Sequence, residues 1–182
     1  MNYPLECRLR TYAIDRAPPY EAISYVWRVF DDNRDISYIF CNGRLLKITW
    51  NLDEALFHST GRKSTKYLWA DAICINQRDK NERARQVRSM GAIFAQASRV
   101  LAWLGGKAGE AFEVVRLLRK AVHLSGQTDR PVLIKMVKEV PEPSWIDFHE
   151  VVYKEWFSRI WILQEIGLAS DALLLCEDDA IQ

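Results

Sequence analysis

Polar side chains follow the apolar segments of this sequence at the points where predicted strands end. Parallel strands bring their carboxyl ends to one edge of a sheet, and open α/β sheets bind ligands beyond that edge. A hydroxyl, a carboxylate and two amides at such an edge suit recognition of a polar ligand, and a tryptophan there can stack on a flat ring. The candidate ligand-binding residues are Ser24, Tyr25, Trp27, Asp71, Asn76, Gln77 and Gly105.

Asp71 has two interpretations. Within "WADAICINQ" (residues 69–77) it interrupts an apolar segment near the end of a predicted strand. Its carboxylate can contact a ligand, or it can accept hydrogen bonds from free backbone amides of the following loop. Gly105 and Gly106 have a similar pair of interpretations, because two glycines can cradle a phosphate or form a turn. The residues alone leave these alternatives open.

Two glutamates also have alternative roles. Asp79 and Glu82 have the spacing of a capping box, in which the Glu82 carboxylate satisfies a free backbone amide and complements the helix dipole. Glu165 lies in the apolar segment "WFSRIWILQEIGL", where a buried carboxylate needs a partner such as Arg159 or an arginine of an earlier helix. Glu165 can therefore be half of a structural ion pair or a functional acid.

The elements that must position these residues alternate along the chain, because segments with a period of two residues alternate with segments of helical period. Asn42-Gly43 predicts the turn of a hairpin, since both residues tolerate positive φ, and Asn51 is expected to cap the next helix. The predicted strands cover residues 5–14, 20–27, 36–48 (as the hairpin), 66–75, 99–106 and 171–176. The predicted helices cover residues 52–59, 79–97, 109–125 and 147–168.

This order predicts an α/β fold with a mostly parallel central sheet, flanking helices, and an added N-terminal strand and β-hairpin. Residues 66–75, 79–97 and 99–106 form a predicted βαβ unit, whose strands are parallel and whose crossover is right-handed. The polar, proline-bearing stretch 126–143 is interpreted as a mobile lid or an insertion. A chain of 182 residues suits a single domain. The abrupt end after a strand-like segment suggests a domain of a longer protein.

Composition limits the possible partners. Lys and Arg together number 25 and Asp and Glu 24, so no overall field attracts nucleic acid or an anionic membrane. No segment approaches the roughly 20 consecutive apolar residues of a membrane span. Four cysteines stand far apart without zinc-binding spacing, and the charged N-terminus lacks the apolar core of a signal peptide. A reduced, cytoplasmic protein without a metal is the expectation.

Three blocks of the sequence resemble the HET (heterokaryon incompatibility) domain. They are "PPYEAISYVW", "LWADAICINQRDKNERARQVRSMGAIFAQASRVLAWLG" and "WFSRIWILQEIGLA", which stand in the family's order between about Tyr20 and Ala169. The resemblance implies a cell-death effector domain of fungal self/non-self recognition, with partners among other death-signalling proteins. The family usually has glycine after the tryptophan of the first block, where this chain has Arg28. Arg28 can hinder a ligand's approach or supply a phosphate-binding charge.

The HET domain has also been related to TIR domains, which implies a flavodoxin-like fold, self-association and, in some lineages, hydrolysis of NAD. By that analogy Glu82 is the first candidate for a catalytic glutamate and Glu165 the second. A carboxylate can stabilise the oxocarbenium-like cation that forms when the nicotinamide–ribose bond breaks. Arg83 or a helix N-terminus would then hold the pyrophosphate, and Tyr25 or Trp27 would stack on a ring. NAD would be a substrate, with no tightly bound cofactor.

Two hypotheses about function follow. In the first, the domain is an NAD-cleaving enzyme, and Glu82 or Glu165 lines a cleft together with Asp71 and Ser24. In the second, it is a non-enzymatic signalling module that oligomerises or recruits partners. The module hypothesis predicts that the carboxylates are paired with arginines and that an apolar surface is exposed.

Overall fold

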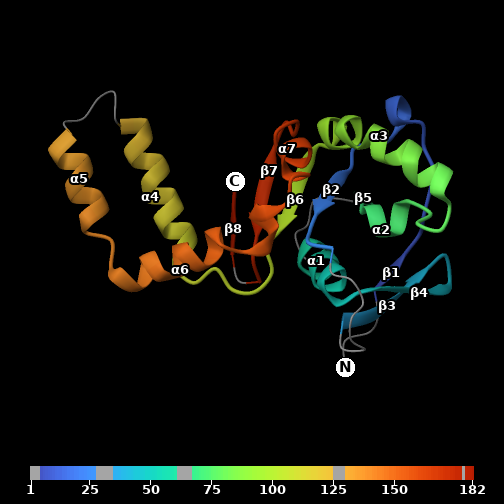
Figure 1. Cartoon of the computed structure of the whole chain (residues 1–182), viewed down its shortest axis with the longest axis horizontal. Helices are drawn as coiled ribbons and strands as arrows, with labels where there is room; N and C mark the ends of the chain where they lie inside the picture. Colours follow the sequence, from blue (N-terminus) through green and yellow to red (C-terminus); the bar gives the residue numbers. More distant parts are fainter. Residues whose placement is uncertain (1–4, 28–34, 61–66, 125–129, 178) are drawn as a thin grey trace.

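The computed structural model describes residues 5–27, 35–60, 67–124, 130–177 and 179–182 and shows a mixed α/β fold (Figure 1). Its larger sheet has five strands in the order β5-β2-β6-β7-β8. Neighbours are parallel except at the last pair, where β8 is antiparallel to β7. The strands are β2 (Glu21–Ser24), β5 (Leu68–Trp69), β6 (Arg99–Trp103), β7 (Ala172–Leu175) and β8 (Ala180–Ile181).

When the strands of this sheet are numbered by their order along the chain, their spatial order across the sheet is 2-1-3-4-5. The chain adds β5 on one side of β2 and then adds β6 on the other side. The gap between the carboxyl ends of β2 and β6 is therefore the topological switch point of the sheet, the place where open α/β sheets bind ligands. The predicted βαβ unit is present with parallel strands, although β2 lies between its two strands.

A second sheet has three strands and includes the predicted hairpin. In it β1 (Glu6–Cys7) is parallel to β3 (Ile36–Cys41), which is antiparallel to β4 (Arg44–Thr49). Asn42 and Gly43 have φ of 52° and 73°, so both turn residues adopt the left-handed region that the pattern predicts. The added strand and hairpin are confirmed, but the regular part of the N-terminal strand is much shorter than residues 5–14.

Two helices that begin near the carboxyl ends of β2 and β5 pack against the sheets. The helix α1 (Trp50–Thr60) buries Leu52 and Ala55 in the main core cluster. The helix α3 (Lys80–Gln96) begins at Asp79, whose carboxylate accepts hydrogen bonds from two backbone amides of the first turn. Its opposite end buries Phe94 against Ala22 and Val100 of the larger sheet. The amphipathic pattern of 79–97 thus becomes a helix that packs one face on β2 and β6.

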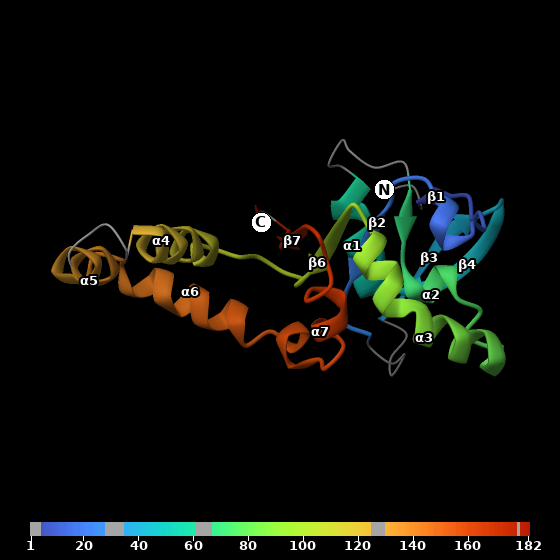
Figure 2. The same ribbon diagram turned by 90° about the horizontal axis from the view of Figure 1, so that it is seen from above.

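Three helices form an arm that projects from the sheet, as Figures 1 and 2 show. They are α4 (Ala111–Leu124), α5 (Arg130–Lys138) and α6 (Glu142–Val152). The stretch 126–143, predicted as a mobile lid or an insertion, is helical over 130–138 and from Glu142 onward, and residues 126–129 lie outside the described chain. Pro131 is the second residue of α5, where the fixed φ of a proline is compatible with the first helical turn.

Two predicted elements are broken in the structure. The strand over 66–75 ends at Trp69, and the short helix α2 (Asp71–Cys74) follows. The helix over 147–168 is divided into α6, a 3₁₀ turn at Glu155–Ser158 and α7 (Ile162–Glu165). A continuous helix turns about 100° per residue and would place Trp156 and Glu165 on opposite faces, whereas both contact Ser24 here.

No helix within the described ranges is both long and apolar enough to cross a membrane.

Candidate functional site

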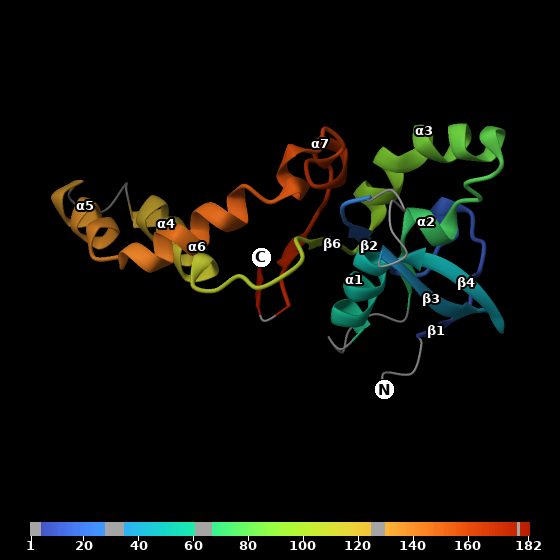
Figure 3. The same ribbon diagram turned by 60° about the horizontal axis from the view of Figure 1, so that its bottom comes forward.

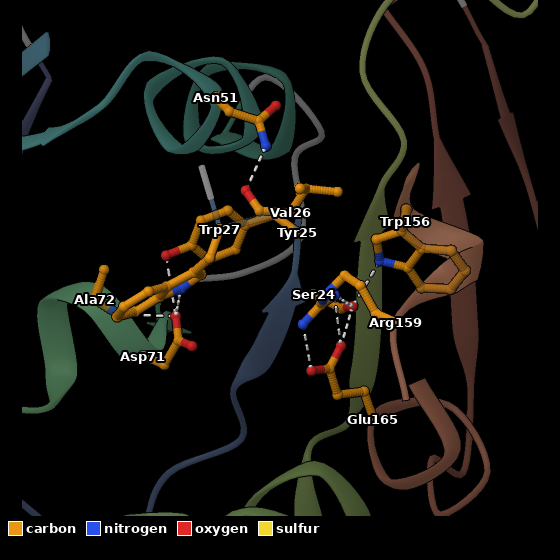
Figure 4. A network of polar contacts seen from close by, with 10 residues as sticks. All are labelled: Ser24, Tyr25, Val26, Trp27, Asn51, Asp71, Ala72, Trp156, Arg159 and Glu165. Carbon is orange, nitrogen blue, oxygen red and sulfur yellow. Dashed lines mark hydrogen bonds and ion pairs between the residues drawn. The ribbon is translucent and has the colours of Figure 1, made fainter. Parts of the chain in front are cut away.

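A buried polar cluster surrounds Ser24 at the carboxyl end of β2 (Figure 4). The Ser24 hydroxyl donates to Oε2 of Glu165, and the indole Nε1 of Trp156 donates to Ser24 Oγ at 2.8 Å. All three side chains are almost inaccessible to solvent. The 3₁₀ turn and α7, at the other end of the sequence, therefore attach to β2 through one serine.

Arg159 completes this cluster. Its guanidinium donates to Glu165 from two nitrogens, at 2.8 Å to Oε1 and 3.1 Å to Oε2, and approaches Ser24 Oγ at 3.4 Å. The exposed fraction is 18% for the Arg159 side chain and 2% for Glu165. A bidentate pair of this kind is geometrically specific and offsets the desolvation of both charges. The interpretation of Glu165 as half of an ion pair with Arg159 is confirmed.

A second cluster surrounds Asp71 at the start of α2. Its Oδ1 accepts three hydrogen bonds: from the Tyr25 hydroxyl at 3.0 Å, from Trp27 Nε1 at 3.0 Å and from the Ala72 amide at 2.8 Å. Its backbone carbonyl accepts a fourth from Gln77 Nε2 at 3.0 Å. Asp71 thus bonds to the following amide, as the loop interpretation predicts, and it also binds two aromatic side chains beyond the end of β2.

The two clusters influence one another electrostatically. Burial raises the pKa of Asp71 above its ordinary value, while the donors Trp27 and Tyr25 and the positive charge of Arg159 lower it in part. Burial, together with the neighbouring Asp71 carboxylate, raises the pKa of Tyr25, which keeps its hydroxyl a donor. Arg159 therefore pairs with Glu165 and also acts on Asp71 across the end of β2.

The raised pKa of Asp71 predicts a pH-dependent stability. Above the ordinary value of 3.8 the folded chain holds this proton more tightly than the unfolded chain, so the contribution of Asp71 to stability falls as pH rises through the folded pKa. Asp71→Asn keeps an acceptor for all three donors and removes the titration. The stability of wild type relative to Asp71→Asn should decline across this range, by at most about 1.4 kcal/mol per pH unit. Urea unfolding of both proteins at several pH values measures the difference, and parallel pH profiles would contradict it.

The Glu82 carboxylate has a structural contact of its own. It accepts a hydrogen bond from the backbone amide of Asn76 at 3.0 Å, while Asp79 caps the helix. This is a variant of the predicted capping box, because Glu82 reaches back beyond the N-cap residue to the loop. The Asn76 side chain accepts from the Arg78 amide at 3.2 Å, and Arg83 is exposed. The contacts of Glu82 therefore organise the loop before α3, whereas those of Glu165 lie within the Ser24 cluster.

Asn51 connects the segment just after β2 to β6, which its predicted role as a cap did not anticipate. Its Nδ2 donates to the Val26 carbonyl at 2.9 Å, and its Oδ1 accepts from Trp103 Nε1 at 3.1 Å. The amide of Leu52 bonds instead to the Thr49 hydroxyl at 3.2 Å. No signal in the sequence distinguishes an asparagine that caps a helix from one that bonds to two segments far away in the chain.

Gly105 and Gly106 lie in the irregular, bent segment after β6. Their φ values are 69° and 59°, which favour glycine. The Gly105 carbonyl accepts from Lys154 Nζ, and the Gly106 carbonyl accepts from the Glu177 amide at 2.8 Å. These contacts agree with the turn interpretation. Arg28, in contrast, lies outside the described residues.

The structure therefore brings together Ser24 with Glu165, and Tyr25 and Trp27 with Asp71. The Ser24 cluster is buried and its polar atoms are paired, whereas 49% of the surface of Trp27 is exposed beside Asp71. Within the described ranges, no three His, Cys, Asp or Glu side chains gather in a way that could hold a metal ion. Solvent and ligands can thus reach the Asp71 side of the switch point more readily than the Ser24 side.

Sequence relatives cover both clusters. A family model described as heterokaryon incompatibility protein (HET) matches residues 20–165. The chain is 28% identical over 208 aligned positions to heterokaryon incompatibility protein 6, OR allele, of Neurospora crassa. That alignment covers 94% of this chain and 31% of the relative, so the chain spans about a third of the relative's length. No solved structure matches the chain.

Proposed function

The chain belongs to the heterokaryon incompatibility (HET) family, and from this premise we propose that it is a death-signalling module of fungal self/non-self recognition that acts by self-association. The name of the Neurospora relative supports the biological role. The arrangement of side chains in residues 153–168 supports the mode of action. This segment pairs Arg159 with a buried Glu165 and exposes six large apolar side chains.

The exposed apolar residues of 153–168 are the observation that carries this proposal. Tyr153, Ile160 and Leu163 have exposed fractions of 75%, 76% and 74%. Further exposed members of this segment are Phe157, Trp161 and Leu168. Large apolar surfaces of this kind mark sites of protein association. We call these six residues the apolar surface of the α7 segment; Figure 3 shows α7 beside the end of the sheet.

The buried ion pair explains why these side chains face solvent. Trp156, Arg159 and Glu165 all turn towards Ser24. Ile160, Trp161 and Leu163, which lie between them, are directed outward, whereas Ile162 packs against the core. The same pairing leaves Glu165 with little free capacity to contact a ligand. Both features match the module hypothesis, which expects carboxylates paired with arginines and an exposed apolar surface.

The double variant Ile160→Asp/Leu163→Asp tests self-association. Placing two charges in an apolar interface should weaken association of the chain by at least about tenfold, which is about 1.4 kcal/mol. Sedimentation velocity over a concentration series measures the effect. Leu45→Asp, at a position of β4 with 59% exposure, is the matched control and should associate like wild type. A wild-type chain that stays monomeric at every concentration, or a double variant that associates normally, would reject the proposal.

We propose hydrolysis of NAD as a second candidate function, because the Asp71 cluster lies beyond the carboxyl end of β2, next to the switch point of the sheet. The strand order 2-1-3-4-5 is that of flavodoxin-like folds, although the last strand is antiparallel here, and this order supports the relation to TIR domains. In this scheme Trp27 stacks on a ring of the dinucleotide and a carboxylate stabilises the cation that forms at the ribose. The bond from ribose to the nicotinamide nitrogen breaks, water supplies the hydroxyl to the ribose, and a proton is released.

Chromatographic detection of nicotinamide after incubation with NAD tests this candidate. The chain should be assayed at concentrations where it is monomeric and where it is associated, since assembly can complete a site. Release of nicotinamide by wild type that Asp71→Asn or Glu165→Gln reduces would support catalysis at the switch point. Release that only Glu82→Gln reduces would assign the reaction to the loop before α3. No release from associated protein would leave the module as the remaining function.

A further inference from the structure

A pocket of about 770 Å³ lies on the side of the molecule where the N-terminal segment crosses the edge of the larger sheet. Residues 5–20 form one wall, and β5, α2 and one face of α3 form the others. The residues that line it belong to neither the Ser24 cluster nor the Asp71 cluster. Its volume falls within the range of small-molecule sites, which is about 300–1,000 Å³. It is therefore large enough to hold a ligand independently of the switch point.

The inner wall of the pocket is apolar and held in place. Ile39, Leu56, Ala70 and Ile93 line it and are buried in the structure. Ile39, Leu56 and Ala70 are members of the main core cluster, so this wall continues the hydrophobic core. A ligand here would contact preformed apolar surface, which favours an apolar body.

Aromatic side chains shape the remaining walls. The Tyr20 hydroxyl donates to the Ile93 carbonyl at 2.5 Å, which fixes the orientation of its ring. Trp69 packs edge-to-face on Phe94 with 5.5 Å between centroids, and Tyr12 packs edge-to-face on Tyr67 at 6.0 Å. Of these five rings, all except Phe94 line the pocket. Rings held by their own contacts lose little conformational freedom when a flat or extended molecule binds between them.

Positive charge exceeds negative charge along the pocket. Arg8, Arg10 and Glu6 are its charged lining residues. Interactions with Tyr12 and Tyr67 raise the pKa of Arg10, so its guanidinium lies close to the aromatic wall. All three charged residues are exposed, which places them at the mouth rather than in the apolar interior. A guanidinium presents paired donors that match a carboxylate or a similar anionic group.

We propose that this pocket binds a small molecule that has an apolar body and one anionic group, of the class of aromatic or aliphatic carboxylic acids. The body lies against the wall formed by Ile39, Ile93 and Trp69, and the anionic group lies at the mouth near Arg10. This site is separate from the proposed association surface and from the proposed site of NAD hydrolysis. Binding can thus occur whether or not either proposal holds.

Calorimetric titration of the 182-residue chain with matched acids and amides tests the site. The probes are naphthoate and octanoate, each compared with its neutral amide. The acids should bind about tenfold more tightly than the amides, because a charge-assisted hydrogen bond is lost in the amide. If only naphthoate binds, the ligand is an aromatic acid, and if only octanoate binds, it is an aliphatic acid. If both bind, the pocket recognises any apolar body that carries a carboxylate.

Two variants with matched controls connect binding to this pocket. Ser89→Trp adds bulk from the pocket-lining face of α3, and Ala84→Trp adds the same side chain at an exposed position of α3 that does not line the pocket. Ser89→Trp should weaken acid binding by at least about tenfold through lost space, whereas Ala84→Trp should not. Arg10→Gln should remove the preference for acid over amide, and Arg16→Gln, away from the pocket, should keep it. Circular dichroism establishes that each variant is folded.

Absence of acid binding to the wild-type chain would overturn the proposal. Binding that Ser89→Trp and Ala84→Trp weaken equally would also overturn it, because the ligand would then bind elsewhere on α3 or only to loosened protein. Equal affinity of the wild-type chain for acid and amide would refute the proposal that the ligand carries an anionic group. None of these results depends on self-association or on nicotinamide release.

Discussion

Replacing Glu165 with alanine is expected to lower the free energy of unfolding by about 3–5 kcal/mol, the usual effect of removing one partner from a buried ion pair. Arg159 would keep its charge in a site where 18% of its side chain is exposed, without the two acceptor oxygens that it contacts now. Ser24 would also lose the acceptor for its hydroxyl. The loss should appear as a lower midpoint of urea unfolding, while the slope of the unfolding free energy against urea concentration (the m value) stays unchanged.

A surface ion pair provides the control for this measurement. Lys135 and Glu139 approach to 3.7 Å with side chains 76% and 64% exposed, so Glu139→Ala should change stability by less than about 0.5 kcal/mol. The double variant Glu165→Ala/Arg159→Ala should be more stable than Glu165→Ala, because no unpaired charge remains buried. If Glu165→Ala were as stable as Glu139→Ala, the ion pair would not hold α7 to β2.

Replacing Phe94 with alanine is expected to cost a similar amount, about 3–5 kcal/mol, for a different reason. Phe94 is 1% exposed and packs with Ala22 and Val100 of the sheet, and its ring meets Trp69 edge-to-face. Alanine would leave a cavity between α3 and the larger sheet, since neighbours on a regular helix and sheet can close it only in part.

Phe57→Ala on α1 is the matched control for this substitution. The Phe57 side chain is 51% exposed, so its removal takes much less apolar surface from the folded state and should cost under about 1 kcal/mol. Urea unfolding followed by far-ultraviolet circular dichroism measures both variants. Equal losses of stability for the two variants would show that α3 does not depend on Phe94 for its packing on the sheet.

Local patterns were sufficient where a few neighbouring residues decide the structure. The Asn42-Gly43 turn depends on two residues that tolerate positive φ, and the start of α3 depends on Asp79 and the amides just after it. Period and length likewise predicted the parallel strands and the added hairpin. The pairing of Glu165 with Arg159 was foreseen as one alternative because a carboxylate in an apolar segment needs a partner.

Long-range contacts account for the predictions that failed. The segment after Trp69 has a strand-like pattern, yet Asp71 leaves the strand and accepts bonds from Tyr25 and Trp27, which lie far earlier in the chain. Residues 147–168 were predicted as one helix, but the contacts of Trp156 and Glu165 with Ser24 require the helix to break between them.

The sequence by itself determined the family, the α/β class, the hairpin and the set of polar residues that end the strands. Periodicity, capping and turn residues act within a few positions, so a reader of the chain can evaluate them without knowing the fold. Only the tertiary structure decided which of those polar residues meet. Folding brought Ser24 to Glu165 and Asp71 to Trp27, linked Val26 to Trp103 through Asn51, and directed Ile160 and Leu163 outward. Strand order and burial, which depend on the whole chain at once, set those contacts.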